Sequence, residues 1–407
     1  MEPVFDRREE DGLSAFLTGS FLGDPYPLYA RLRETSPVFR LQSGLLLVTR
    51  YADVDAVLRD RRFVHDMARS IAKRHGAHVL RNPILQWLTN VVLTIDPPEH
   101  TRVRRLAVGA FSAKRVAGLR GQVQAVVDRL IDAVEAERQM DVIADFAHRL
   151  PVIVICDLLG IPERDRAPFL EAPLDLARAF DPTPMPKEVR DAQNLKIERI
   201  LAYFSALAER RRREPGDDLL SALVQAEEGN RGLSDAEVSN NAAFLFVAGH
   251  ETTANLIGNG LWALHRNPAQ LARLKADPDL MPRAVEELLR YESPVQLTER
   301  EAAEEVVLAG RRIRKGETVV AVMGSANRDP AAFEDPDRLD IARAGPRNLA
   351  FGQGIHYCLG AQLARLEGGL ALATLLRRLP GLEVEVETPR WRANANLRGL
   401  ESLPACW

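Results

Sequence analysis

The sequence predicts one mainly helical domain with small β-sheets. Helical periodicity and capping signals cover most of the 407 residues, whereas short β-like runs are confined to two regions, around residues 38–48 and 305–323. No internal repeat, low-complexity block or flexible linker divides the chain. We therefore treat residues 1–407 as a single domain.

The composition is that of a globular protein with a large core. Hydrophobic residues make up 46% of the chain and charged residues 27%, which argues against disorder. The formal net charge of -3 gives no general attraction to nucleic acids or acidic membranes. The chain starts with charged residues, and no apolar stretch is long enough to span a bilayer. We expect neither a signal peptide nor a membrane anchor.

Only three cysteines occur, Cys156, Cys358 and Cys406, and they lie far apart. An odd, scattered set of this kind is not a disulfide framework. We therefore expect a reducing environment and a cytoplasmic location. We also expect a monomeric protein.

The secondary structure follows from periodicity and from turn signals. Two β-like runs, 38–41 and 45–48, flank a Gln-Ser-Gly turn, and three more lie at 305–308, 312–313 and 318–323. The stretch 64–93 has no clear period and predicts irregular structure with at most one short helix. The predicted helices cover residues 28–36, 101–110, 115–137, 142–159, 165–180, 188–213, 234–265, 282–291 and 360–376.

The helix expected from Ser234 is the most distinctive element. Ser234 and Glu237 form a capping box, and Asn267 followed by Pro268 ends the helix. About thirty residues at ~1.5 Å each span ~45 Å, enough to cross the molecule. Because residues 242–248 are almost all apolar, this helix is expected to be buried on every side.

The segment 351–360, FGQGIHYCLG, carries the strongest chemical signal. It places Cys358 after a glycine-rich loop and directly before a helix, whose first N–H groups favour a thiolate. Gly352 allows the backbone to approach a flat ligand, and His356 can reach a carboxylate of that ligand. For a cysteine alone, the alternative is a buried structural residue in a tight turn.

A second signal, AGHETT at 248–253, lies in the middle of the long buried helix. Glu251 and Thr252 are costly there unless they are paired or functional. A threonine can bond back to the carbonyl one turn earlier, so we expect a distorted turn able to hold water. The alternative is a kink with a solvated glutamate. A zinc protease motif is excluded, because Ala254 stands where HExxH requires its second histidine.

The 351–360 loop matches every fixed position of F-G-x-G-x-H-x-C-x-G and so resembles the haem-binding loop of the cytochrome P450 superfamily. The resemblance covers nearly the whole chain. It implies the cytochrome P450 fold, with haem b (iron protoporphyrin IX) between the long helix and the cysteine loop, and Cys358 as the axial iron ligand. It also implies that Ala248, Phe351, Gly352 and Gly360 contact the haem.

The same resemblance assigns roles to the polar turn, which matches the family's A-G-x-[DE]-T motif. It implies that Thr252 holds dioxygen and its water and that Glu251 relays protons. The substrate pocket is expected above the haem, lined by Phe244, Leu245, Val295, Leu297 and, by position in the family, Leu397 and Leu400.

Several cations are candidates for binding the two haem propionates. The resemblance points to His100 and Arg104 on one helix, to Arg300 and to His356. Many bacterial members have a histidine where this chain has Asn348, and we leave that position out of the site.

Glu287 and Arg290 match a structural E-x-x-R pair. We expect Arg338 as its third member, with Arg343 as the competing choice.

The implied activity is that of a haem-thiolate monooxygenase, which inserts one oxygen atom from O2 into a C–H or C=C bond of an apolar small molecule. We expect a role in secondary metabolism such as polyketide, terpenoid, steroid or fatty-acid oxidation. No fused reductase is visible, so we expect electrons from a separate ferredoxin and ferredoxin reductase. The alternatives are a peroxide-using relative and a haem-based sensor, neither of which needs the Glu251–Thr252 pair.

The stretch 64–93 is expected to form a lid over the pocket. It carries Arg69, Lys73, Arg74 and Arg81 against the single acidic residue Asp66. These cations either face water or hold an anionic end of the substrate near the lid. The sequence leaves both interpretations open.

Overall fold

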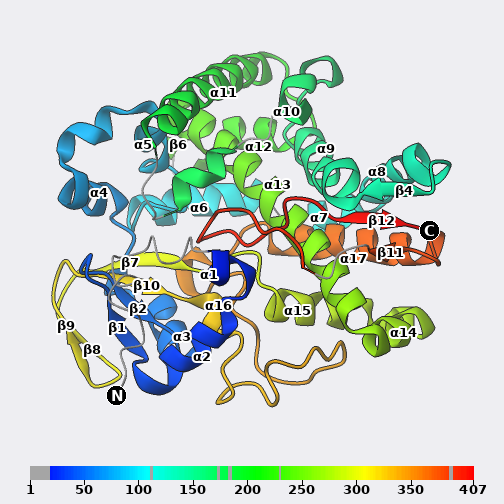
Figure 1. Ribbon diagram of the computed structural model, residues 1–407. Coiled ribbons are helices and arrows are strands. Elements are labelled where there is room, and N and C mark those ends of the chain that lie inside the picture. Colours follow the sequence, from blue (N-terminus) through cyan, green and yellow to red (C-terminus); the bar gives the residue numbers. More distant parts are fainter. Residues whose placement is uncertain (1–18, 111–112, 172–174, 182–185, 229–230, 385–387) are drawn as a thin grey trace.

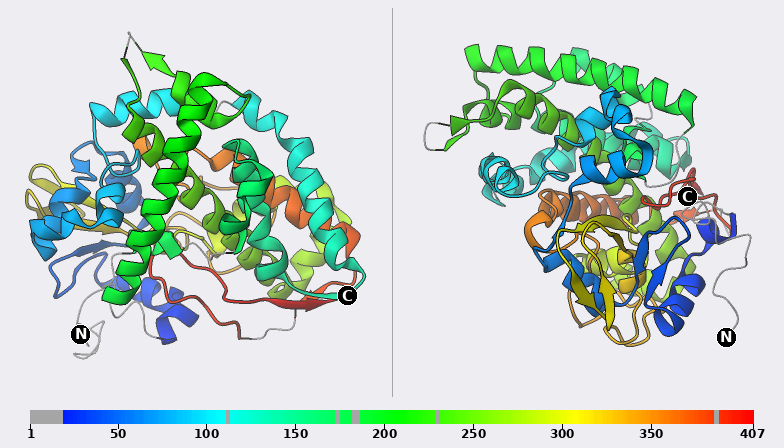
Figure 2. Two further views of the ribbon diagram at one scale, coloured as in Figure 1. Left: turned by 90° about the horizontal axis from the view of Figure 1, so that it is seen from above. Right: turned by 90° about the vertical axis from the view of Figure 1, so that its left-hand side faces the viewer.

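A computed structural model describes residues 19–110, 113–171, 175–181, 186–228, 231–384 and 388–407. A helix-rich part and a smaller part built around a twisted sheet lie side by side, and the long helix α13 (Asp235–Arg266) runs through the helix-rich part (Figures 1 and 2). The prediction of a mainly helical protein with small sheets is confirmed. No helix in these described ranges is long and apolar enough to cross a membrane.

The helices occupy most of the chain. The α-helices are α1 Gly19–Gly23, α2 Tyr26–Thr35, α3 Tyr51–Arg59, α4 Met67–His75, α5 Pro83–Leu88, α6 Glu99–Ala110, α7 Ala113–Gly118, α8 Arg120–Glu135, α9 Arg149–Leu158, α10 Ala167–Glu171, α11 Lys187–Arg213, α12 Leu219–Gln225, α13, α14 Pro268–Ala276, α15 Met281–Tyr291, α16 Met323–Ala326 and α17 Ala361–Arg378. Short turns of other pitch are η2 Ala77–Arg81, η3 Val142–Ala147, η4 Glu163–Asp165, η5 Asp175–Phe180, η6 Pro278–Leu280 and η7 Gly354–His356.

The largest sheet has five strands in the order β1-β2-β10-β7-β3. Only the β10–β2 pair is parallel, because a long segment of chain separates those two strands. A three-stranded sheet has the order β11-β12-β4, and two hairpins complete the set. The strands are β1 Val38–Arg40, β2 Leu46–Val48, β3 Phe63–Val64, β4 Gln139–Asp141, β5 Glu227–Glu228, β6 Arg231–Gly232, β7 Thr298–Ala302, β8 Val306–Leu308, β9 Arg311–Ile313, β10 Thr318–Ala321, β11 Glu383–Val384 and β12 Pro404–Cys406.

Helix α13 starts with the expected capping box. The Ser234 hydroxyl accepts from the N–H of Glu237 at 3.3 Å, and the N–H of Ser234 donates to the Glu237 carboxylate at 2.8 Å. Beyond the cap the helix is buried almost throughout, packed against α9, α11, α15 and α17. The predicted central helix is therefore confirmed, with its end at Arg266 before Asn267.

Several elements differ from the sequence-based expectation. The stretch 64–93 holds α4, η2 and α5 rather than one short helix, and the carboxylate of Asp66 caps α4 by accepting from the N–H of Arg69. The helix expected over 115–137 is divided into α7 and α8, and the one over 142–159 begins as the wider turn η3. Helices α3, α12 and α14 and strand β7 were not expected. These elements are short, so periodicity carries little information about them.

The buried Glu287–Arg290 pair joins α15 to the loop that follows α16. Arg290 donates two hydrogen bonds to the Glu287 carboxylate, at 2.7 and 2.8 Å, and reaches the carbonyls of Asn327 and Pro336. The third member is Arg343, whose Nε donates to Glu287 at 3.0 Å.

The expectation that Arg338 completes this cluster is wrong. The Arg338 side chain is 61% exposed and lies 3.9 Å or more from its acidic neighbours, Asp335 and Asp340. Only its backbone carbonyl takes part, as an acceptor for Arg290 and Arg343. Sequence spacing could not separate the two arginines, because the fold of the loop decides which guanidinium points inward.

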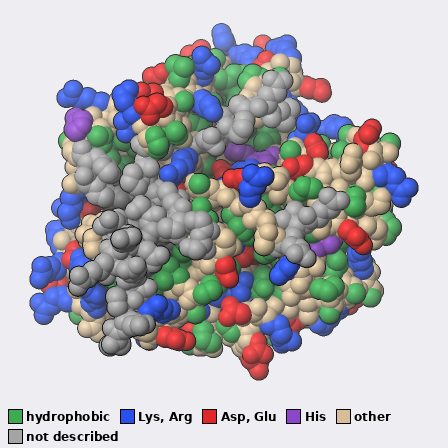
Figure 3. All heavy atoms as spheres, in the orientation of Figure 1, with side chains coloured by type: hydrophobic (Ala, Val, Ile, Leu, Met, Phe, Trp, Pro, Cys, Tyr) green, Lys and Arg blue, Asp and Glu red, His purple; other side chains and the backbone are tan. Residues whose placement is uncertain are grey.

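Charged side chains of both signs are interspersed over the described part of the surface in Figure 3. That distribution agrees with the small net charge of the chain.

The two arginines make a matched pair of test variants. Arg343→Ala should lower the free energy of unfolding by about 3 kcal/mol, because it removes one cation from a buried carboxylate. Arg338→Ala should change it by less than about 0.5 kcal/mol, since that side chain faces water. Urea unfolding followed by circular dichroism measures both values. Equal losses in the two variants would contradict the assignment of Arg343.

Candidate functional site

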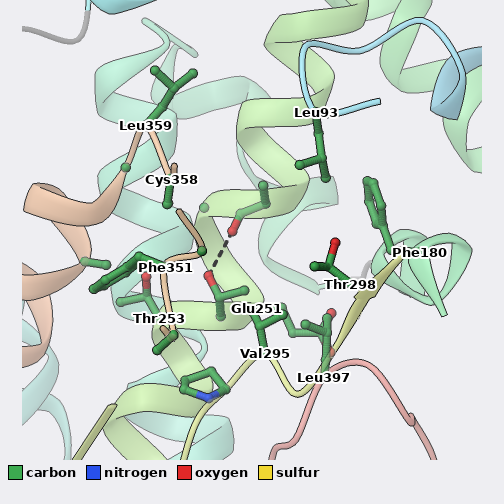
Figure 4. Close-up of a pocket in the computed structure, with 18 of the residues that line it drawn as sticks. Leu93, Phe180, Glu251, Thr253, Val295, Thr298, Phe351, Cys358, Leu359 and Leu397 are labelled. Atoms are coloured by element: carbon green, nitrogen blue, oxygen red, sulfur yellow. Dashed lines mark hydrogen bonds between the residues drawn. The ribbon is translucent and has the colours of Figure 1, made fainter. Parts of the chain in front are cut away.

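A cavity of about 280 Å³ lies between α13 and the loop that precedes α17. Its wall is largely apolar, and residues from α13, from the segment after α15 and from the C-terminal loop contribute to it (Figure 4). Leu93, Phe180, Val295 and Leu397 lie on the side of the pocket away from Cys358 in that view. Such a cavity fits a large apolar ligand better than a polar one.

Cys358 lines this cavity at the start of α17. Its N–H donates to the carbonyl of Phe351 at 3.0 Å, which closes the loop, and its side chain is exposed to the cavity. Burial within the protein raises the pKa of the Cys358 thiol, while the N–H groups of Gly360 and Ala361 and the cation of Arg104 act to lower it. The helix start alone therefore does not yield the thiolate, and a bound metal cation would complete its deprotonation.

Gly352 and Gly354 of this loop are each required for a different structural reason. Gly352 and Gly354 both have positive φ, at 67° and 68°. A Cβ on Gly354 would lie 2.4 Å from the carbonyl oxygen of Leu58, so the loop packs directly on the backbone of α3. A Cβ on Gly352 would meet no protein atom within 4 Å, and Gly352 lines the cavity. The loop is thus held against the protein on one side and left open on the other.

No group of three or more His, Cys, Asp or Glu residues in the described part of the chain could hold a metal ion. A metal at Cys358 would therefore take its other ligands from a bound organic group. A planar macrocycle with its own metal satisfies that requirement.

Across the cavity, α13 presents its polar turn. The Thr252 hydroxyl donates to the carbonyl of Ala248 at 2.9 Å, which is the expected bond to the preceding turn. The helix nevertheless continues without a break from Asp235 to Arg266, so the distortion expected here does not interrupt it. Ala248, Glu251 and Thr252 all line the cavity, as predicted.

Glu251 is connected to the protein surface through Arg392. The Arg392 guanidinium lies 3.5 Å from the Glu251 carboxylate and contacts the ring of His148 with its other nitrogen. Burial and the Arg392 cation lower the pKa of His148 to about 3, so this imidazole is neutral. His250, one residue before Glu251, bonds to the carbonyl of Phe246 instead of facing the cavity. Sequence reasoning did not find Arg392, which lies in a C-terminal loop.

Basic groups gather at another part of the wall. Arg104 and Arg300 line the cavity with His356, while His100 packs on the His356 ring at 4.3 Å between centroids. Burial lowers the pKa of Arg300 to about 10 and also lowers that of Arg104. Both guanidinium groups donate to backbone carbonyls, Arg104 to Tyr357 and Arg300 to Glu299, and neither has a carboxylate within ion-pair distance among the described residues. The four residues predicted to bind the propionates therefore lie close together. Three of them line the cavity, and His100 contacts it only through the ring of His356.

The predicted pocket side chains are brought together as expected. Phe244, Leu245, Val295, Leu297 and Leu397 all line the cavity, with Phe351, Gly352 and Gly360 on the cysteine side. The expectation that Leu400 lines it is wrong, because Leu400 pairs with Trp391 in a short bridge and is buried there. Asn348, which was left out of the predicted site, donates to Glu286 and lies away from the cavity.

The lid stretch contributes Val92 and Leu93 to the wall, and none of its described cations (Arg69, Lys73 and Arg81) lines it. Arg69 lies 3.5 Å from the buried carboxylate of Glu301, and Lys73 donates to the carbonyl of Gly316 at 2.7 Å. Arg81 is exposed, and the side chain of Arg74 lies outside the described part of the structure. The charged residues of this stretch thus hold α4 to the sheet or face water.

Glu367 is a wall residue that sequence reasoning missed. It lies on α17 four residues after Leu363, and both line the cavity, so helical spacing was the available signal. Burial raises the pKa of the Glu367 carboxyl to about 8, and its Oε2 has no hydrogen-bond partner. The wall therefore contains a second acid, which is mostly neutral at pH 7.

Comparison with known proteins gives the same family from sequence and from structure. The sequence model of the family described as Cytochrome P450 matches residues 168–392. The cytochrome P450 monooxygenase PikC of Streptomyces venezuelae is 43% identical over 399 residues, covering 95% of this chain and 92% of PikC. The polyketide biosynthesis cytochrome P450 PksS of Bacillus subtilis (strain 168) is 38% identical over 397 residues, covering 94% and 96%.

Among solved structures, the fold is similar to that of P450BioI in its complex with hexadec-9Z-enoic acid ligated acyl carrier protein. The TM-score is 0.88 at 36% sequence identity, and the match covers 96% of this chain and 100% of that chain.

Proposed function

This chain belongs to the cytochrome P450 family of haem-thiolate monooxygenases, and we propose that it inserts one oxygen atom from O2 into a C–H or C=C bond of an apolar small molecule. The observation that carries this proposal is the position of Cys358, which faces the same cavity as Glu251 and Thr252 of α13. A peroxide-using enzyme or a haem-based sensor would not need that acid and hydroxyl in the cavity wall next to an apolar stretch of the helix.

The residues around the cavity fit haem. Cys358 would bind the iron, and the open side of the loop at Gly352 would face the macrocycle. The buried nitrogens His100 Nε2 and His356 Nδ1 have no hydrogen-bond partner, which is costly unless a bound group supplies an acceptor. With Arg104 and Arg300 they would hold the two propionates.

Bound haem would supply the iron that activates O2, with electron density donated by the Cys358 thiolate. The chain itself would supply protons and exclude bulk water. The Thr252 hydroxyl can release the carbonyl of Ala248 and turn toward the cavity, because it lies on the cavity wall. Glu251 would exchange protons with water at the surface, next to the Arg392 side chain, which is 29% exposed and whose guanidinium itself stays protonated.

We propose that a separate ferredoxin and its reductase supply the electrons. PikC and PksS match this chain over more than nine-tenths of their own lengths, so these relatives have no room for a fused reductase domain. We also propose that the protein is a cytoplasmic monomer, which leaves its surface accessible to a diffusing ferredoxin.

The substrate that we propose is an extended acyl chain, such as a polyketide or fatty-acid intermediate. PksS is described as a polyketide biosynthesis enzyme, and P450BioI was crystallised with a fatty acid on its carrier protein. Apolar side chains make up most of the wall of this cavity, and Thr298 and Asn396 are the neutral polar residues near its distal part.

The iron ligand can be tested by spectroscopy. Reduced protein with carbon monoxide should show the red-shifted Soret band of a thiolate-bound carbonyl. Cys358→His should keep part of its haem and lose that band, because imidazole replaces the thiolate. Cys156→Ser, which changes a buried cysteine away from the cavity, serves as the control and should keep the band. An imidazole-type spectrum in the wild type would overturn the assignment.

Proton delivery can be tested in an assay with a ferredoxin and its reductase. Thr252→Ala should bind haem and substrate normally, but the product formed per NAD(P)H should fall about tenfold or more while hydrogen peroxide rises. Thr252→Ser keeps the hydroxyl and should retain most of the coupling. The role of Thr252 is disproved if the alanine variant is as well coupled as the wild type.

The substrate class can be tested with matched ligands. Because no described cation of the lid lines the cavity, a fatty acid and its methyl ester of equal chain length should shift the ferric spin state with affinities equal within about threefold. Arg69→Ala should leave both affinities unchanged. Tighter binding of the acid that disappears in Arg69→Ala would instead support an anionic substrate held at the lid.

A further inference from the structure

Three histidines from separate parts of the chain meet at the basic end of the cavity. His65 follows β3, His100 lies on α6 and His356 lies on η7. The rings of His65 and His356 contact edge to face with centroids 4.5 Å apart, and those of His100 and His356 are 4.3 Å apart. His65 was not among the residues that the sequence indicated, because it lies in a stretch without a recognisable pattern.

Of the three histidines, only His65 has two buried ring nitrogens without a hydrogen-bond partner. Its ring is 6% exposed, and neither Nδ1 nor Nε2 has a hydrogen-bond partner. A neutral imidazole has one donor and one acceptor, so burial without any partner costs on the order of 1–3 kcal/mol per group. A histidine that only filled space would be replaced at no loss by an apolar side chain of the same size. The unpaired nitrogens of the His65 ring therefore indicate that a polar ligand binds beside this ring.

The charges around His65 identify that partner as an anion. Asp96 is the carboxylate of the cluster, and it is already occupied by the N–H groups of His65 and Asp66, at 3.0 to 3.1 Å, and by His356 at 3.9 Å. Arg300 and Arg104 supply two permanent cations. Two guanidinium groups against one carboxylate leave an excess of positive charge in a buried place.

Burial and the neighbouring Arg300 and histidines hold the pKa of His65 well below its usual range. In the absence of a bound anion the imidazole therefore stays neutral, because burial and the surrounding cations disfavour its protonated form. An added carboxylate would reverse that local charge and would accept a hydrogen bond from the ring.

We propose that His65 is a further ligand of the haem propionates, donating a ring N–H to the carboxylate that Arg300 also binds. The inference rests on the proposed position of haem in this cavity. It assigns to the end of β3 a role in holding the cofactor, in addition to the groups on α6, β7 and η7 that the sequence indicated. His65 packs on His356, which lines the cavity, so it also fixes the orientation of that ring.

The rate of haem release tests this role without reference to activity. Ferric holoprotein is mixed with an excess of apomyoglobin, and the transfer of haem is followed in the Soret region. His65→Phe keeps the size of the ring and removes its N–H, and it should release haem about tenfold faster than the wild type. His65→Gln keeps a donor and should fall between the two. His78→Gln, a change at an exposed histidine, serves as the control and should release haem at the wild-type rate.

A second arm separates hydrogen bonding from packing. When the wild type and His65→Phe are loaded with the dimethyl ester of haem, the carboxylates are gone and the tenfold difference should vanish. A difference that persists with the ester would show that His65 acts by packing alone and would overturn the proposal. Equal release rates with native haem would overturn it as well.

The same samples distinguish this inference from the proposed function. If the reduced wild type with carbon monoxide shows the thiolate-type band and His65→Phe still releases haem at the wild-type rate, only the role of His65 is wrong. If the wild type lacks that band, the proposed haem site fails, and the inference fails with it.

Discussion

A helix of 32 residues that is apolar through its middle is stable in water only when the rest of the protein covers it, and this chain is arranged around that requirement. Helices α9, α11, α15 and α17 pack against α13 on different sides. Between residues 244 and 256 one side of α13 faces the cavity instead of a neighbouring helix, and the turn that carries Glu251 and Thr252 lies in this part. The site thus lies where the neighbouring helices do not pack against α13.

The second requirement is that polar groups in the cavity wall find partners. Thr252 is satisfied by the carbonyl of Ala248 and Glu251 by Arg392, so the polar turn of α13 is stable as it stands. The basic end differs, because the rings of His65, His100 and His356 carry buried nitrogens without partners. The unfolding free energy of the protein is lowered by these groups until a ligand with carboxylates binds. Cofactor binding and folding are therefore expected to stabilise each other.

The buried cluster of Glu287, Arg290 and Arg343 serves a different purpose. It joins α15 to the loop between α16 and the cysteine segment through a carboxylate with two cationic partners. Glu287 also accepts from the N–H of Asp340, which fixes the course of the backbone there. Since the Cys358 loop follows directly, this cluster positions the thiol without touching it.

Continuous patterns in the sequence were enough to determine the helical class, the capped central helix and the cysteine loop. Each of these depends on residues close together in the chain: the capping box at Ser234, the apolar run before Gly249, and the glycines before Cys358. Local hydrogen bonds and helical period fix such features before any tertiary contact forms. Of the apolar pocket side chains, Phe244 and Leu245 lie on the central helix, whereas Val295, Leu297 and Leu397 lie on other segments and were expected only from the resemblance to the family.

Only the tertiary structure decided which distant side chains meet. Arg343 rather than Arg338 faces Glu287, Arg392 reaches Glu251 from the C-terminal loop, and His65 joins His356 across the end of β3. The stretch 64–93 formed short helices. Of its described cations, Arg69 and Lys73 contact residues of the sheet region and Arg81 faces solvent, and none lines the cavity. Spacing along the chain carries no information on these contacts, because the direction of a loop side chain is set by the packing of the segments on either side of it.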